Sequence, residues 1–148
     1  MSKISKRIKV SAGVVIVRKE KNEYLFLMMR SGGYWEAGAK GKVEKGESEF
    51  EGALREVEEE TTLTPDELDF KWGKIKYTTE PYTKNKKKIA VFYLAEVERA
   101  EVSIPFNPEI GKKEHDEYQW MTYNQAKKVV NDRISKVLDW ANEKIHSK

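Results

Sequence analysis

The chain has 148 residues, 39% of them hydrophobic and 36% charged, so we expect one domain with a modest core over residues 1–148. Its 28 basic and 25 acidic residues nearly balance, which excludes a protein that binds nucleic acid by bulk positive charge alone. The absence of cysteine excludes disulfides and thiolate zinc sites, and no apolar run approaches the ~20 residues of a membrane span, so a cytoplasmic protein without a membrane partner is expected.

The first third of the chain predicts a pair of strands followed by a loop. Residues 8–17 and 24–30 are rich in β-branched and aromatic side chains, and a polar turn separates them. The glycines at 32 and 33 end the second strand. We expect the glycine-rich, charged residues 38–47 to form a loop.

A helix is expected to begin after Ser48, because Ser48 and Glu51 have the spacing of a capping box. The apolar residues that follow recur at steps of three and four: Phe50, Ala53, Leu54 and Val57. The helix is expected to end near Thr61, because residues 64–67 resemble the start of another helix, with proline in its first turn.

The rest of the chain predicts further strands and a closing helix. Strands are expected at residues 68–79, 86–97 and 117–121, and a long loop at residues 103–116. A second capping box precedes one amphipathic helix with apolar residues from 126 to 145. The fold class is therefore mixed α and β. The four tryptophans are expected in the core: Trp35, Trp72, Trp120 and Trp140.

Acidic residues are concentrated at the predicted helix. Seven glutamates and one arginine lie between residues 47 and 60, and Glu56, Glu59 and Glu60 fall on one side of the helix. Like charges three or four residues apart destabilise a helix by a few tenths of a kcal/mol per pair. A hard divalent cation would compensate, since Mg²⁺ prefers oxygen ligands. The alternative is a solvated acidic face without a ligand.

The order of residues around these glutamates resembles the Nudix signature. Gly41 is followed by five variable residues and then Glu47, and Glu47 is followed by seven variable residues and then Arg55-Glu56. An aliphatic residue, one variable residue and Glu59-Glu60 come next. The family pattern continues with one variable residue, a glycine and an aliphatic residue. In this chain, Thr62 occupies the position of that glycine. Because that glycine ends the helix, we expect the helix exit to be affected.

The resemblance implies a fold, a cofactor and a set of roles. Nudix proteins form an α/β/α sandwich around a mixed sheet and hydrolyse nucleoside diphosphates linked to another group, using Mg²⁺ or Mn²⁺. By resemblance, the metal ligands are Gly41, through its carbonyl, and Glu56, Glu59 and Glu60. Arg55 would orient these carboxylates, and Glu47 would secure Arg55. Two histidines, His115 and His146, lack any metal-ligand spacing.

A general base is also needed, and Nudix enzymes keep it either among the signature glutamates or on a distal loop. Glu114, in the long predicted loop, is the candidate for a distal base or a last metal ligand. The alternative for Glu114 is an ordinary surface carboxylate beside Lys112 and Lys113. The sequence leaves both alternatives open.

Within the family, the chain most resembles the asymmetrical diadenosine tetraphosphate hydrolases. The resemblance rests on Trp35, residues 40–47, residues 82–94, and Glu114-His115 followed by Tyr118 and Trp120. The chain departs from that subgroup at Gly38-Ala39, where the subgroup usually has prolines, and at Lys42, where it has histidine.

Lysines and tyrosines near these motifs are candidates for binding the nucleotide substrate. Lysines suit a chain of phosphates, and the flat face of tyrosine suits a base. The candidates are Lys40, Lys42, Lys86 and Lys88 for phosphate, and Tyr82 and Tyr118 for adenine. The alternatives are lysines that solvate a strand edge and tyrosines that belong to the core.

The sequence therefore predicts a monomeric, Mg²⁺-dependent hydrolase that cuts diadenosine tetraphosphate into ATP and AMP. A Nudix enzyme that acts on RNA 5′ ends, diphosphoinositol phosphates or non-canonical nucleoside triphosphates is an alternative, because lysines suit all of these polyanions. A non-catalytic Nudix domain that senses nucleotides or RNA is an alternative of another class, but no signature glutamate is missing here.

Overall fold

A computed structural model of the chain describes residues 8–107, 112–113 and 115–147. The strands are β1 (Lys9–Glu20), β2 (Glu23–Ser31), β3 (Tyr34–Ala37), β4 (Ala39–Lys42), β5 (Tyr77–Thr78), β6 (Lys88–Glu96), β7 (Phe106–Asn107), β8 (Lys112–Lys113) and β9 (Glu117–Met121). The helices are α1 (Glu49–Thr61), the 3-10 helix η2 (Pro65–Glu67), α2 (Tyr123–Lys127) and α3 (Asp132–His146).

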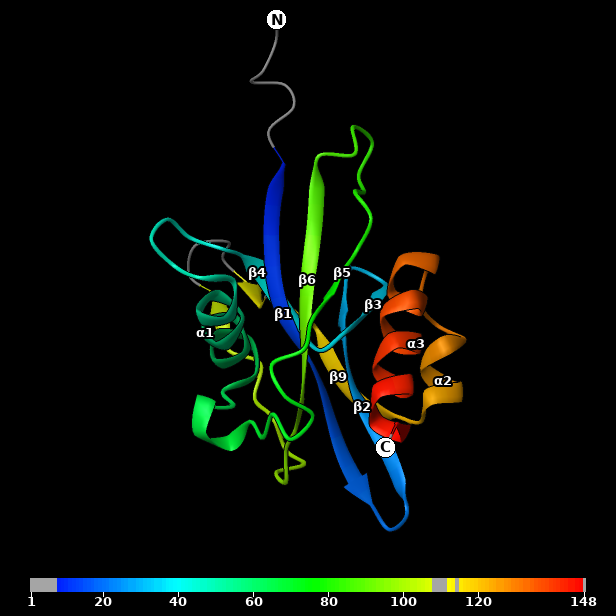
Figure 1. Ribbon diagram of the computed structural model, residues 1–148. Helices are drawn as coiled ribbons and strands as arrows, with labels where there is room; N and C mark the ends of the chain where they lie inside the picture. The colour runs from blue at the N-terminus through cyan, green and yellow to red at the C-terminus, as the bar shows by residue number, and fades with distance from the viewer. Residues whose placement is uncertain (1–7, 108–111, 114, 148) are drawn as a thin grey trace, which may run out of the picture.

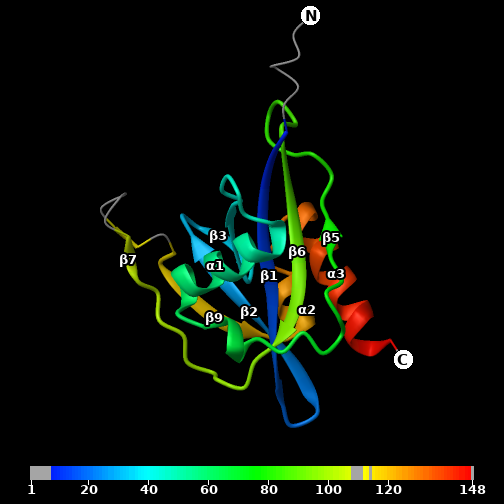
Figure 2. The same ribbon diagram turned by 60° about the vertical axis from the view of Figure 1, so that its left-hand side comes forward.

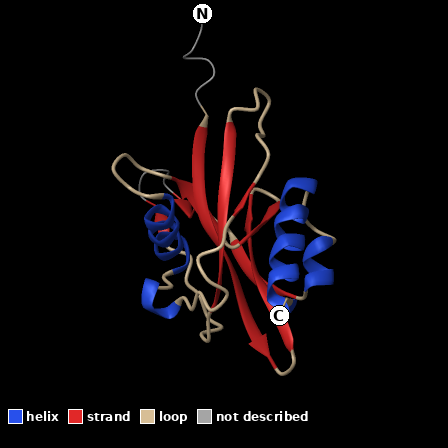
Figure 3. Ribbon diagram, in the orientation of Figure 1, coloured by secondary structure: helices blue, strands red, loops and turns tan. Residues whose placement is uncertain are grey.

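The molecule has three layers, as the α/β/α expectation requires (Figures 1 and 3). A seven-stranded sheet forms the middle layer, in the order β3-β2-β1-β6-β5, with β4 paired to β1 and β9 paired to β2. Helix α1 covers one face, and α2 and α3 cover the other. The β1–β2 hairpin and the β5–β6 connection project from opposite ends of the sheet (Figure 2). No helix in the described part of the chain could span a membrane.

Strand β1 organises the sheet because it pairs with three other strands. It runs parallel to β6 and antiparallel to β2 and β4. Side chains alternate between the faces of a strand, so Val14 and Ile16 pack toward α1 while Val15 and Val17 pack toward α3. Both faces are covered, and the strand therefore has a continuous run of buried residues from 12 to 17.

The capping box at the start of α1 is confirmed. The Ser48 side chain accepts a hydrogen bond from the Glu51 N–H at 3.0 Å, and the Glu51 carboxylate accepts one from the Ser48 N–H at 2.9 Å. Ala53 and Val57 are fully buried against the sheet. The local sequence alone specifies this helix, because its cap and its apolar period lie within fourteen consecutive residues.

Helix α1 ends at Thr62 in the conformation that glycine would adopt. Thr62 has φ 64° and its N–H donates to the Glu58 carbonyl at 3.0 Å. The helix exit is therefore kept despite the missing family glycine. A β-branched residue in the left-handed region is strained by about 1–2 kcal/mol.

We expect Thr62→Gly to stabilise the protein by about 0.5–1 kcal/mol, because relief of this strain exceeds the extra unfolded-state entropy of glycine. Urea unfolding measures the change. Thr64→Gly is the matched control, since Thr64 has φ −87° and caps η2, so that variant should be less stable than the wild type. A Thr62→Gly protein less stable than the wild type would contradict the strain argument.

Several element predictions were wrong or incomplete. Residues 38–47 are not only a loop, because β4 pairs with β1 there; glycine and lysine give no strand pattern, so only the partner strand specifies β4. Residues 68–79 are mostly irregular, with one bridge from Asp69 to Glu96 and the two-residue strand β5. The long loop at 103–116 contains the short pair β7–β8.

The predicted closing helix is two helices. Helix α2 ends at Lys127, and the Asn131 side chain accepts a hydrogen bond from the Ile134 N–H at 2.9 Å to cap α3. The apolar period spans both helices because both pack on the same face of the sheet. The four tryptophans are only partly buried and pack against the rim of the core: Trp35, Trp72, Trp120 and Trp140.

Candidate active site

Arg55 joins the loop before α1 to the carboxylates of the helix. Its Nε and Nη2 donate to the two oxygens of Glu47 at 2.6 and 3.0 Å, and Nη2 also donates to the Lys42 carbonyl at 2.9 Å. Its Nη1 donates to Glu56 at 2.9 Å and to Glu59 at 3.3 Å. The arrangement fits the predicted orienting role of Arg55 and the anchoring role of Glu47.

Both members of the Arg55–Glu47 pair are held in their charged forms. The fork of hydrogen bonds from Arg55, together with the Glu44 N–H, lowers the pKa of Glu47 to about 2. The hydrogen bonds that Arg55 donates to Glu47, opposed by partial burial, raise the pKa of the Arg55 guanidinium above its ordinary value. A paired guanidinium and carboxylate form a planar, directional contact, so Glu47 fixes the position of Arg55.

Glu56 lies directly against β4. A Cβ atom at Gly41 would lie 2.1 Å from the carboxyl carbon of Glu56 and 2.2–2.4 Å from its oxygens, so no other residue fits at position 41 without displacing that carboxylate. The side chain of Glu56 is 12% exposed. Glycine at the first position of the signature therefore allows the helix carboxylate to touch the sheet edge.

The other two signature carboxylates have different surroundings. The Glu59 side chain is 58% exposed, and Arg55 is its only ion-pair partner among the described residues. The Glu60 side chain is 3% exposed, and its Oε1 lies 2.8 Å from Nε2 of His115, whose side chain is 9% exposed. Sequence analysis considered His115 only as a family landmark and excluded it as a metal ligand paired with His146; it did not relate His115 to Glu60, which is 55 residues away.

The donor set suits a hard divalent cation, although no three acidic or imidazole side chains in residues 8–107, 112–113 and 115–147 converge closely enough to hold one as they stand. Carboxylates that repel one another turn to separate partners, here Arg55 and His115. Three carboxylates on adjacent turns supply the oxygen ligands that Mg²⁺ or Mn²⁺ prefers, and Glu59 is exposed enough to rotate. The residues therefore fit a metal-binding role.

Lysines gather on the face of the sheet opposite α1. In-register residues of neighbouring strands share a face. The register pairs Lys42 with Ser11, Lys40 with Gly13, and Lys88 with Lys9. Positions 9, 11 and 13 of β1 share the face of Val15, which packs toward α3. Three of the predicted phosphate-binding lysines thus lie on one face, which we call the lysine face (Lys9, Lys40, Lys42 and Lys88).

Tyr82 belongs to the same side of the sheet. It bridges to Lys88, packs against the core beneath α3, and carries the Arg133 guanidinium 4.0 Å from its ring centroid. Arg133, in the first turn of α3, was missed by sequence analysis because nothing in its local pattern relates it to residue 82. Lys86 is exposed in the turn between Tyr82 and Lys88, with φ 53°.

Two predicted site residues are not joined to this group. Tyr118 lies on the α1 face of β9, where it packs against the core and its hydroxyl accepts a hydrogen bond from the Val102 N–H at 3.4 Å. Its contacts are those of a core residue, so they do not favour the adenine-binding role. Glu114, the candidate base, lies outside the described residues.

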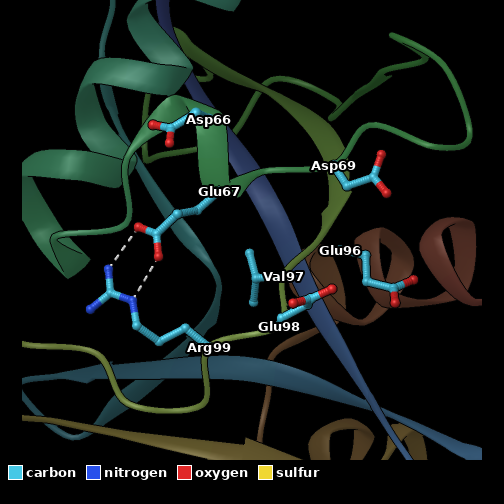
Figure 4. A pocket seen from close by; sticks show the side chains of 7 residues that line it. All are labelled: Asp66, Glu67, Asp69, Glu96, Val97, Glu98 and Arg99. Atoms are coloured by element: carbon cyan, nitrogen blue, oxygen red, sulfur yellow. Dashed lines mark hydrogen bonds and ion pairs between the residues drawn. The ribbon is translucent and has the colours of Figure 1, made fainter.

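An acidic hollow lies beyond the C-terminal end of α1, where η2 and the end of β6 meet (Figure 4). Its lining residues are Asp66, Glu67, Asp69, Glu96, Val97, Glu98 and Arg99. Arg99 donates to both oxygens of Glu67 at 2.9 Å and lowers its pKa to about 2; it also donates to the Thr62 carbonyl at 2.9 Å. The excess of carboxylates would repel a phosphate chain, and Arg99 instead contacts the residue at the end of α1.

Comparison with known proteins agrees with the geometry. The sequence model of the NUDIX domain family matches residues 7–141. The asymmetrical bis(5′-nucleosyl)-tetraphosphatase of Rattus norvegicus is 31% identical over 104 residues, which cover 70% of this chain and 67% of the rat protein. The enzyme of the same name from Sus scrofa is 30% identical over the same coverage.

Solved structures show the same fold. A binary complex of the Caenorhabditis elegans Ap4A hydrolase superimposes with a TM-score of 0.74 at 24% identity, covering 89% of this chain and 93% of that one. The MutT protein from Methanosarcina mazei superimposes with a TM-score of 0.67 at 25% identity, covering 96% and 98%.

Proposed function

The chain belongs to the Nudix hydrolase family, and we propose that it hydrolyses diadenosine tetraphosphate asymmetrically, with water, to ATP and AMP. The observation that carries the proposal is the placement of two groups on opposite faces of β4: the Glu56 carboxylate of α1 lies against Gly41 on one face, and the lysine face lies on the other. The names of the rat and pig relatives support the choice of substrate.

Each residue of the site has a proposed task in this reaction. Glu56, Glu59 and Glu60, with the Gly41 carbonyl, would hold Mg²⁺ or Mn²⁺, Arg55 keeps Glu56 and Glu59 in place, and Glu47 keeps Arg55 in place. When bound, the cation neutralises phosphate charge and makes the attacking water more acidic. A carboxylate of the signature, or Glu114, takes a proton from an attacking water as the water oxygen bonds to a phosphorus away from the centre of the tetraphosphate; the phosphoanhydride P–O bond between the AMP and ATP portions breaks, and the two nucleotides separate.

The lysine face is proposed to bind the phosphates that flank the reacting one. Its four ammonium groups offset the repeated negative charges of a tetraphosphate without requiring a fixed geometry. Tyr82 lies at the end of this surface and is proposed to stack on an adenine, with Arg133 supporting its ring from one side. The exposed Lys86 would reach the same phosphates.

We expect Lys88→Ala to raise the KM for diadenosine tetraphosphate about tenfold and to leave kcat nearly unchanged, because one charge-assisted contact of about 1.5 kcal/mol or more is lost away from the reacting atoms. Steady-state kinetics measures both constants. Lys128→Ala is the matched control, because Lys128 is exposed at the end of α2 and outside the lysine face. Equal KM values for the two variants would contradict the assignment.

The direct test is product analysis. The protein is incubated with diadenosine tetraphosphate and Mg²⁺, and the nucleotides are resolved by ion-exchange chromatography. Equal amounts of ATP and AMP are expected. Two molecules of ADP, or no turnover, would contradict the proposal. Faster turnover of triphosphorylated RNA, a diphosphoinositol phosphate or an oxidised nucleoside triphosphate would contradict the choice of substrate. The assignment of the protein as a hydrolase would then still stand.

A further inference from the structure

His115 makes a buried contact with one of the signature carboxylates. Its Nε2 lies 2.8 Å from Oε1 of Glu60, and both side chains are more than nine-tenths buried. The pair connects α1 to the start of β9, two elements that are otherwise distant in the sequence.

The backbone beside His115 is fixed by the sheet. The Asp116 N–H donates to the Arg30 carbonyl at 2.9 Å, and Arg30 forms ion pairs with Asp116 and Glu117 at 3.4 and 3.3 Å. Residues of β9 then pair with β2 in register. The imidazole is therefore presented to Glu60 from a backbone segment that is held against β2, so the carboxylate is held at a defined place.

A buried carboxylate next to an imidazole could serve stability alone. Glu60, however, is four residues after Glu56, which touches β4, so the two side chains lie on the same side of α1. A carboxylate can bind a cation through one oxygen while the other accepts a hydrogen bond, and such outer partners fix the orientation of the ligand. The contact with His115 uses Oε1 of the Glu60 carboxylate.

We propose that His115 is a positioning residue that holds the Glu60 carboxylate for divalent-cation binding. The proposal rests on the proposed function, because it requires Glu60 to be a metal ligand. Loss of the imidazole N–H would allow Glu60 to rotate, so the cation would bind more weakly even without nucleotide. A purely structural contact would affect stability and leave the affinity for the cation unchanged.

The test uses Mn²⁺ alone, titrated by calorimetry into the full chain. We expect His115→Leu to weaken Mn²⁺ binding about tenfold, and His115→Gln, whose amide N–H can replace Nε2, to recover most of the affinity. His146→Gln is the matched control, because His146 is exposed on α3 and its Nδ1 lies 2.8 Å from the Asn142 carbonyl. In a Glu60→Gln background, His115→Leu should cause no further loss.

The outcomes separate the two proposals. Wild-type affinity in His115→Leu, or a further loss in the Glu60→Gln background, overturns the role of His115 and leaves the proposed function intact. A wild type that takes up no Mn²⁺ overturns the proposed function itself. If His115→Leu does not fold, His115→Asn replaces it, because the shorter amide cannot reach Oε1 and should weaken Mn²⁺ binding in the same way.

Discussion

Glu59→Gln is expected to lower kcat by about 10³-fold, or about 4 kcal/mol of transition-state stabilisation, while the thermal unfolding midpoint stays near that of the wild type. Glutamine is nearly the same size as glutamate but lacks its charge, so a proposed metal ligand is lost. The side chain is 58% exposed and does not pack in the core, so stability should not depend on it. Steady-state kinetics and calorimetric unfolding measure the two effects.

Glu58→Gln is the control for this prediction. Glu58 is the preceding residue on α1, is also exposed, and faces away from the signature side of the helix. Its replacement should leave kcat within about twofold, because a distant surface charge is largely screened. If both variants lost activity equally, the total charge of the helix would matter rather than a specific ligand. If neither lost activity, Glu59 would have no part in the reaction.

Arg55→Met is expected to have the second largest effect, because it removes hydrogen bonds to four other residues at once. The variant leaves Glu47 and Glu56 without their guanidinium partner, and we expect a loss of about 2 kcal/mol of stability, less than for a fully buried pair because Arg55 is partly exposed. We also expect kcat to fall about 10²-fold, since Glu56 and Glu59 lose their fixed positions. Urea unfolding and kinetics measure the two changes.

Arg55→Lys tests the geometry of the contact. Lysine keeps the charge but cannot donate to both oxygens of Glu47 and to the Lys42 carbonyl together. It should therefore recover part of the stability and little of the kcat. Full recovery of kcat by lysine would show that only the positive charge is needed.

The Arg55–Glu47 contact also predicts a pH dependence of stability. The pKa of Glu47 lies near 2 in the folded protein, below its ordinary value of 4.5, so the unfolded chain takes up the proton first as the pH falls. The stability that this pair gives is present above pH 4.5 and is lost as the pH falls toward 2. Arg55→Met should reduce the dependence of the unfolding free energy on pH, which is measured by urea unfolding at several pH values. Part of this dependence should remain in the variant, because Arg99 lowers the pKa of Glu67 in the same way.

The sequence named most residues of the lysine face, but only the fold shows that they lie on the same face of the sheet. Lys40, Lys42 and Lys88 were predicted to bind phosphate because they lie near the sequence motifs of the subgroup. The alternative was an ordinary role at the protein surface. Their shared face depends on the register of β1 with β4 and with β6, which no local pattern reveals. Tyr118 had an equally good local signal, but its strand directs it to the α1 face.

The sequence by itself determined helix α1, its cap and the identity and spacing of its carboxylates, because these depend on residues within a few turns of one another. Only the tertiary structure decided which groups those carboxylates meet. Gly41 touches Glu56, His115 touches Glu60, and Arg133 covers Tyr82. These contacts join distant parts of the chain through the packing of helices on a mixed sheet, so they follow from the strand order and the register rather than from any local pattern.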